Sequence, residues 1–176
     1  MNYIILLALK DEAPALATRD NVFFTGVGKV NAAIVTAQLI ERYKPRLVIN
    51  FGTAGGITKE SGLHSITQFV QRDTNCTALG FNMGQTPYED YLAIGEGLTC
   101  SSGDSFVDNP VLAIPADVVD MEAYAIAKAC HLSNTQFLCF KFISDSANKT
   151  ASTDWSSMIS SGEEYYINKL SELNLN

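Results

Sequence analysis

Two kinds of apolar segment alternate along this chain, and this alternation constrains the fold more than any other feature. Short continuous apolar runs, such as residues 3–9 and 47–51, are typical of strands that are covered on both faces. Residues 29–43 instead place their apolar side chains on one helical face, and Pro45 follows as a stop signal. Strands that alternate with helices predict an α/β layered domain with a largely parallel sheet.

The remaining elements follow from the same patterns. Further strands are predicted at 22–25, 65–71, 98–101, 118–121 and 136–143, and helices at 122–131 and 155–173. Gly162 lies within the last helix, where glycine is unfavourable. Gly52 to Gly56 are predicted to break the strand at 47–51. No linker, repeat or low-complexity tract interrupts the 176 residues, so we expect one domain over 1–176.

Composition excludes several classes of protein. The chain has 12 Lys and Arg against 19 Asp and Glu, a net charge of −7, and shows no basic stripe for nucleic acid. It has no run of eighteen apolar residues, and the apolar N-terminus lacks the basic region of a signal peptide. We therefore expect a cytoplasmic protein with neither nucleic acid nor a membrane as partner.

The cysteines and histidines show no spacing that is typical of a metal site or a disulfide framework. We expect no metal, and we expect the cysteines to be buried free thiols. These residues are Cys76, Cys100, Cys130, Cys139, His64 and His131. The segment Gly52 to Gly56 matches neither a phosphate-binding loop nor a dinucleotide fingerprint, so no nucleotide cofactor is predicted either.

Carboxylates follow three of the predicted strands, at Glu12, Glu122 and Asp145. In α/β sheets, ligands bind at the carboxyl ends of the strands. Each residue also has a structural explanation, because Asp145 can cap the following segment and Glu122 can compensate a helix dipole. Three carboxylates at three strand ends nevertheless form a constellation that capping does not require. Such groups can serve separately as acid, base and cation stabiliser.

Two loops allow both a binding and a structural interpretation. Phe106 lies in the polar segment 102–107, where its ring is either available to stack on a planar base or fills the core beneath the loop. The glycines of 52–56 either let backbone N–H groups approach an oxygen-rich ligand or form an ordinary tight turn.

Taken together, six segments resemble the purine nucleoside phosphorylase/nucleosidase superfamily, and most closely its 5′-methylthioadenosine/S-adenosylhomocysteine nucleosidases. These segments are 9–12, 26–30, 48–56, 102–106, 119–123 and 143–145. The resemblance implies a single-domain three-layer sandwich with a mixed, mostly parallel sheet flanked by helices. It also implies hydrolysis of the N-glycosidic bond of a purine nucleoside, with release of adenine and without a cofactor.

The resemblance further implies roles for individual residues. Asp145, oriented by Ser144, would protonate N7 of the purine. Glu122 and the Met121 backbone would hold the ribose hydroxyls and place negative charge near the developing cation. Glu12 would orient and deprotonate the attacking water.

Other residues are implied as substrate contacts. Phe106 would stack on the base and the Val107 backbone would read its edge, while Trp155 would close over an alkylthio group. Leu79, Phe81 and Pro87 would belong to a loop, 79–87, that reaches the neighbouring subunit's site, which implies a homodimer. Val27, Thr53 and Lys141 complete the set, with Lys141 standing where the family has an arginine.

Two alternatives stay open. Phosphorylases of the superfamily carry an arginine just before the glycine-rich turn, and the stretch 50–53 has none, which favours hydrolysis. A phosphorylase would have to bind phosphate through Lys29 or Arg72 instead. A nucleoside-binding protein without catalysis is the other alternative.

The connection 17–22 is also too short for the hairpin that the nucleosidases carry.

Overall fold

The structure is a computed structural model that describes residues 1–87, 92–109 and 112–175. Its strands are β1 (Tyr3–Leu7), β2 (Val22–Phe24), β3 (Leu47–Gly56), β4 (Leu63–Gln71), β5 (Leu92–Ala93), β6 (Leu98–Ser102), β7 (Val118–Asp120) and β8 (Gln136–Asp145). Its helices are α1 (Lys29–Tyr43), α2 (Ala123–Leu132), α3 (Ala151–Met158) and α4 (Glu163–Glu172), with 3-10 turns at Lys10–Glu12, Leu16–Thr18 and Thr77–Leu79.

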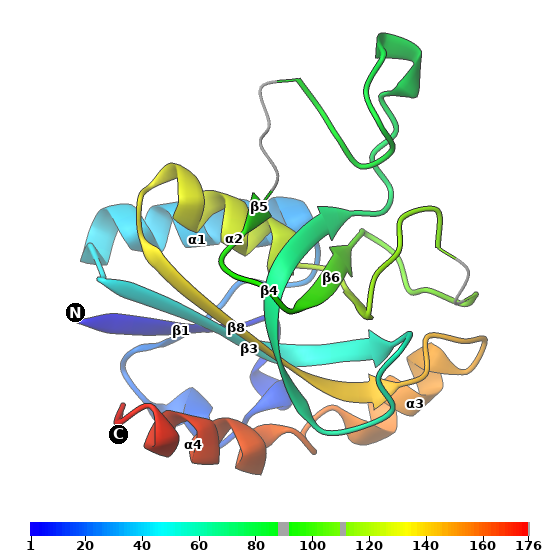
Figure 1. Cartoon of the computed structure of the whole chain (residues 1–176). Helices are drawn as coiled ribbons and strands as arrows, with labels where there is room; N and C mark the ends of the chain where they lie inside the picture. Colours follow the sequence, from blue (N-terminus) through cyan, green and yellow to red (C-terminus); the bar gives the residue numbers. More distant parts are fainter. Residues whose placement is uncertain (88–91, 110–111, 176) are drawn as a thin grey trace.

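The described strands form a mixed sheet in the order β2-β1-β3-β7-β6-β4-β5, and β8 pairs with both β3 and β4. The strands β3, β7, β6, β4 and β8 therefore close into a ring (Figure 1). Closure depends on long strands that change partners: β4 pairs with β8 through residues 63–66 and with β6 through residues 66–71. The mixed α/β sheet is confirmed, but its closure into a ring was not predicted from the sequence.

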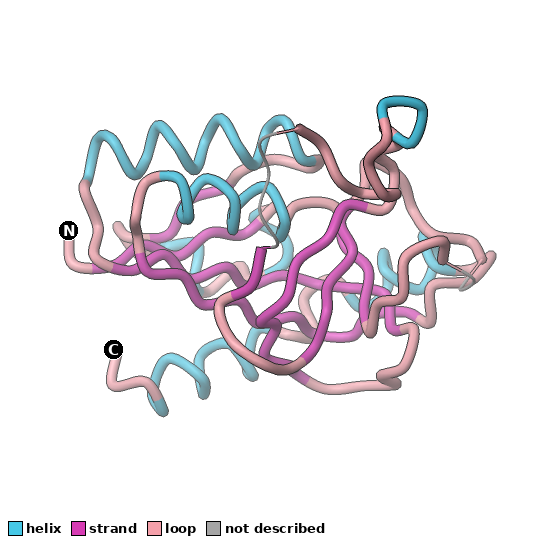
Figure 2. Tube along the Cα trace, turned by 45° about the horizontal axis from the view of Figure 1, so that its top comes forward, coloured by secondary structure: helices cyan, strands magenta, loops and turns pink. Residues whose placement is uncertain are grey.

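Helices cover both faces of the sheet. α1 and α2 lie on one side and α4 on the other (Figure 2). Residues 4–7 of β1 are fully buried because alternate side chains enter two separate cores. Leu6 packs in the core beneath α1 and α2, whereas Leu7 packs with Tyr166 and Leu170 of α4. The prediction of strands covered on both faces is thereby confirmed.

The glycine-rich segment after residue 51 does not end its strand, so the prediction of a break there is wrong. β3 continues to Gly56, and its end pairs with both β7 and β8. A Cβ atom on Gly55 would lie 2.7 Å from Oδ1 of Asp145, and one on Gly56 would lie 1.9 Å from the carbonyl oxygen of Lys59. These glycines are required by close packing rather than by a turn.

The single C-terminal helix predicted at 155–173 is also wrong. The structure has α3 and α4 instead, separated at Gly162. A Cβ atom there would lie 2.5 Å from the phenol oxygen of Tyr166 and 2.9 Å from Cβ of Phe142. The chain therefore bends where Tyr166 and β8 leave no space for a side chain.

Two smaller expectations concern the sheet edge and the thiols. The short connection 17–22 leads directly into β2, which pairs in parallel with β1 at the edge of the sheet. Cys100, Cys130 and Cys139 are buried, as predicted, whereas Cys76 is half-buried. In the described part of the chain, no helix has the length and apolar character to cross a membrane.

The tight contacts at Gly162 predict that Gly162→Ala lowers the free energy of unfolding by about 1–3 kcal/mol, although alanine favours helices. Chemical denaturation measures this change. Gly95→Ala is the matched control, because Gly95 is exposed and an added Cβ would meet nothing closer than 3.8 Å. Equal stabilities of the two variants would contradict the packing argument.

Candidate active site

The carboxyl ends of β1, β3, β7 and β8 converge on one cavity, as the strand-end argument predicts. The cavity lining includes most of the residues that the sequence singled out. These are Glu12, Val27, Thr53, Phe106, Val107, Met121, Glu122, Ser144, Asp145 and Trp155. Residues from seven separate segments of the chain thus meet at one point.

The carboxylate of Glu12 is held by four hydrogen bonds and is only 3% exposed. Its Oε2 accepts the backbone N–H groups of Ala8 and Leu9 at 2.9 and 3.0 Å. Its Oε1 accepts the N–H and the hydroxyl of Thr53 at 3.0 and 3.1 Å. These donors engage both oxygens of the carboxylate and fix its orientation at the cavity.

Glu122 lies at the first turn of α2, but its carboxylate does not cap that helix. Oε1 accepts the N–H of Gly28 at 2.9 Å. Burial, together with the charges of Asp120 and Glu12, raises the pKa of Glu122 to about 7, although Lys141 and the Gly28 N–H act in the opposite direction. The side chain is therefore poised between its two protonation states near neutral pH.

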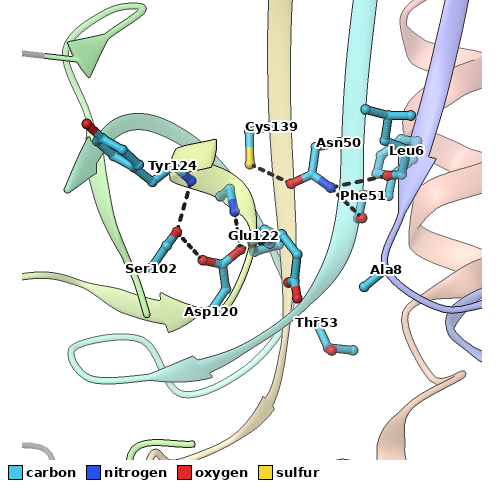
Figure 3. A network of polar contacts seen from close by, with 12 residues as sticks. Leu6, Ala8, Asn50, Phe51, Thr53, Ser102, Asp120, Glu122, Tyr124 and Cys139 are labelled. Atoms are coloured by element: carbon cyan, nitrogen blue, oxygen red, sulfur yellow. Dashed lines mark hydrogen bonds and ion pairs between the residues drawn. The ribbon is translucent and has the colours of Figure 1, made fainter. Parts of the chain in front are cut away.

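A buried ion pair supports this region from below. The ammonium of Lys141 lies 2.9 Å from Oδ2 of Asp120, and both side chains are almost fully buried. Asp120 also accepts the hydroxyl of Ser102 and, at 2.8 Å, the N–H of Ala123 (Figure 3). Burial alone would raise the pKa of Asp120, but Lys141 and these donors hold it below its ordinary value. Asp120, and not Glu122, thus caps the helix.

Asp145 ends β8 at the cavity. Its Oδ2 accepts the hydroxyl of Ser144 at 3.0 Å, which is the contact that an orienting role for Ser144 requires. Its Oδ1 accepts the N–H of Ala147 at 2.9 Å, so Asp145 also stabilises the following turn. The structural interpretation of Asp145 as a turn-stabilising residue is thus confirmed, and the same contacts leave its carboxyl group at the cavity.

Two aromatic rings also line the cavity. Phe106 is 49% exposed, and its ring meets the Trp155 indole edge-on, with 5.9 Å between centroids. The indole N–H donates to Oγ1 of Thr53 at 2.9 Å. Phe106 is thus not buried beneath its loop, and its ring is available to a planar ligand at the cavity.

Four predicted residues do not line the cavity. Lys141 lies beneath it, paired with Asp120. Leu79 and Pro87 are exposed and Phe81 is half-buried, all in the segment after β4. A loop that serves a neighbouring subunit would lie outside the lining of its own cavity, so these three positions do not test that prediction.

The two cations considered as phosphate ligands are engaged by the protein. The Lys29 ammonium forms an ion pair with Asp73 and donates to Gln71. The Arg72 guanidinium reaches the cavity wall but donates to backbone carbonyl groups. Within the described lining, Arg72 is the only basic residue.

Arg72 and Asp120 line the cavity but were not among the residues predicted for a hydrolase site, and Arg72 was considered only as a phosphate ligand. Arg72 directly follows the strand β4, so the strand-end rule that selected the carboxylates also points to it. Asp120 stands within the resembling segment 119–123, but no sequence pattern shows that it pairs with Lys141. The described residues hold no cluster of three metal-ligating side chains.

Comparisons with known proteins identify relatives of this chain. The model of the Phosphorylase superfamily matches residues 17–113 and 111–168. The 5′-methylthioadenosine/S-adenosylhomocysteine nucleosidase of Bacillus subtilis is 34% identical, over 71% of this chain and 67% of that protein. The nucleosidase of the same name from Shewanella halifaxensis is 31% identical, over 77% and 72% of the two chains.

Solved structures share the fold. A futalosine hydrolase mutant of Helicobacter pylori superposes with a TM-score of 0.83 at 20% identity, over 93% of this chain and 94% of that chain. The nucleosidase of Neisseria meningitidis in complex with methylthio-immucillin-A superposes with a TM-score of 0.78 at 25% identity, over 90% and 92%.

The raised pKa of Glu122 makes stability depend on pH. The folded protein binds this proton more tightly than the unfolded chain, so the stabilisation is present at low pH and is lost as the pH rises through about 7. The free energy of unfolding of Glu122→Gln should therefore exceed that of the wild type by about 3 kcal/mol at pH 8.

At pH 5 this advantage should shrink, because Glu122 is then protonated in the folded wild type. Denaturant titrations of both proteins at the two pH values give the comparison. The same difference at pH 5 and pH 8 would contradict a raised pKa.

Proposed function

Because this chain belongs to the phosphorylase superfamily, we propose that its cavity is where the N-glycosidic bond of a purine nucleoside is hydrolysed. The observation that carries the proposal is the meeting of Glu12, Glu122 and Asp145, from three strand ends, around one cavity that Phe106 also lines. The similarity to 5′-methylthioadenosine/S-adenosylhomocysteine nucleosidases favours those two nucleosides as substrates and adenine as the released base.

Asp145 acts as the general acid in this proposal. Purines leave more readily when N7 is protonated, because the electron pair of the glycosidic bond then enters a positively charged ring and the base departs as a neutral molecule. Ser144 and the Ala147 N–H hold the carboxyl group in one orientation at the cavity wall. Phe106 supports the base by stacking, and the Val107 backbone meets the edge of the base.

Glu122 acts on the sugar. The Met121 backbone and the Glu122 carboxylate lie together at the cavity, where ribose hydroxyls can donate to them. As the glycosidic bond lengthens, positive charge develops on the sugar, and an ionised carboxylate in a buried site stabilises that charge strongly. The Lys141 ammonium beneath favours the ionised form of Glu122.

Glu12 receives a proton from the attacking water. Its four hydrogen bonds use the acceptor positions of the carboxylate, so one donor must yield to the water. The Thr53 hydroxyl is the donor that can yield, because its hydrogen rotates about the C–O bond whereas the three N–H donors are fixed in the backbone. The Trp155 N–H then still holds the same hydroxyl oxygen.

The engaged cations favour water over phosphate as the nucleophile. Lys29 pairs with Asp73 and Lys141 pairs with Asp120. Arg72 donates to backbone carbonyls, which leaves no free bidentate fork for a phosphate group. A phosphorylase would need one of these cations to be released.

The resemblance and the surface together favour a homodimer. Val27 at the cavity is 41% exposed, and Val30 and Ile34 on α1 are 67% and 53% exposed. A second copy that covered these apolar side chains would remove them from water. The resemblance implies that its loop 79–87, with Leu79 69% exposed, reaches this site. The apolar Trp155 side of the cavity suits an alkylthio group. The cytoplasmic location stays a prediction from the sequence.

The wild-type protein should release adenine from 5′-methylthioadenosine in phosphate-free buffer. Asp145→Asn should lower kcat by about a hundredfold or more, because it removes the general acid and leaves the side chain's size unchanged. The decrease in absorbance on base release measures both rates.

Asp20→Asn is the control, because Asp20 is exposed and remote from the cavity. An unchanged rate in Asp145→Asn would remove Asp145 from its role. Absence of turnover in the wild type, with adenine still bound, would instead favour the non-catalytic alternative.

A further inference from the structure

We propose that Arg72 is a positioning residue that holds the base-binding loop, Gly103–Val107, against the strand end that carries the ribose-binding groups. This inference rests on the proposed function, because it assigns Phe106 and Val107 to the base. Nothing in the sequence pattern of the site requires an arginine here.

The guanidinium connects three backbone segments. Nη1 donates to the carbonyl oxygens of Ser101 in β6 and, at 2.7 Å, of Asp120 at the end of β7. Nη2 donates to the carbonyl oxygens of Ser105 and, at 2.9 Å, of Gly103. Four of the five N–H groups of the fork thus fix the start of the loop relative to the residue that precedes Met121.

Gly103 supplies the space for this contact. A Cβ atom on Gly103 would lie 2.8 Å from both Cγ and Cζ of Arg72. Gly103 does not have the left-handed backbone conformation that favours glycine, so the close approach of the arginine explains the residue at this position. The loop backbone and the arginine side chain therefore pack as a matched pair.

The residue that follows reinforces the attachment. Asp73 accepts the N–H of Asp104 at 2.8 Å, and its other oxygen pairs with the Lys29 ammonium. Asp104 in turn accepts the Lys29 N–H at 2.7 Å. Two consecutive residues after β4 thus fix the loop. Arg72 binds carbonyl oxygens of the loop, and Asp73 binds one of its backbone N–H groups.

The consequence is a preformed base site. Phe106 is 49% exposed, so little core packing holds its ring in place. The hydrogen bonds of Arg72 and Asp73 to the loop backbone therefore determine the position of the Phe106 ring relative to Glu122 and Asp145. A site preorganised in this way binds the base without ordering a loop, in the ground state and in the transition state alike.

Arg72→Lys tests the proposal. Lysine keeps the charge but has a single ammonium, which cannot span carbonyls of three segments. We expect KM for 5′-methylthioadenosine and the calorimetric Kd for free adenine to rise about tenfold, with kcat changing less than threefold, because uniform binding is lost. A merely structural defect would lower the active fraction and apparent kcat but leave KM unchanged. Arg42→Lys, on the exposed face of α1, is the matched control.

A second measurement does not depend on turnover. Trp155 is the only tryptophan of the chain, and its ring contacts Phe106 of the loop. Displacement of the loop in Arg72→Lys should shift Trp155 emission to longer wavelength and increase its quenching by acrylamide, whereas Arg42→Lys should match the wild type. If the wild type releases no base, the proposed function fails, and the emission of Arg72→Lys still decides whether Arg72 holds the loop.

Gly103→Ala provides an independent variant. The added methyl group would collide with the Arg72 side chain, so KM and emission should change in the same sense as in Arg72→Lys. The double variant should be no worse than Arg72→Lys alone. Native KM, adenine Kd and Trp155 emission in Arg72→Lys would overturn the proposal. Additive effects in the double variant would also overturn it.

Discussion

The buried ion pair between Asp120 and Lys141 is the interaction on which the site depends. Both groups are almost completely removed from water, and breaking such a pair by removal of one partner typically costs about 3–5 kcal/mol. Asp120 also binds Ser102 of β6 and the first N–H of α2, so one carboxylate joins three strands and a helix. Glu122 follows two residues later and Asp145 ends the strand of Lys141. Glu122 and Asp145, two of the carboxylates that line the cavity, thus stand on a framework that the ion pair fixes.

The sequence predicts the convergence of strand ends but not the closure of the sheet. Continuous apolar runs identify β1, β3 and β8, and the apolar face with Pro45 gives α1 at 29–43 as observed. Ring closure depends on which distant strands pair, and a strand such as β4 that changes partners carries no local signal. Likewise, the sequence suggests a turn at Gly55 and an unfavourable helix position at Gly162. In the structure, close contacts with neighbouring side chains and strands explain why both residues are glycine.

The sequence predicted three of the carboxylates that lie at the cavity, but it did not predict the positions of the basic residues. A carboxylate after an apolar strand stands out, because its burial is costly unless it is used. Arg72 donates to backbone carbonyls, which have no residue-type signature, and Lys141 stands beneath the cavity because its partner Asp120 lies there. Carboxylates therefore lie at the cavity, whereas the basic side chains are paired with other groups of the protein. This distribution of charge suits a cationic transition state and a neutral nucleophile such as water.

Analysis of the sugar product in concentrated phosphate buffer distinguishes hydrolysis from phosphorolysis. Adenine is quantified by chromatography, the free sugar by its reducing end, and any sugar 1-phosphate by its ³¹P resonance. We predict equal amounts of adenine and free sugar from 5′-methylthioadenosine, with no sugar phosphate. Formation of a sugar 1-phosphate in step with adenine would show that one of the paired basic side chains is released to bind phosphate, and would contradict the assignment as a hydrolase.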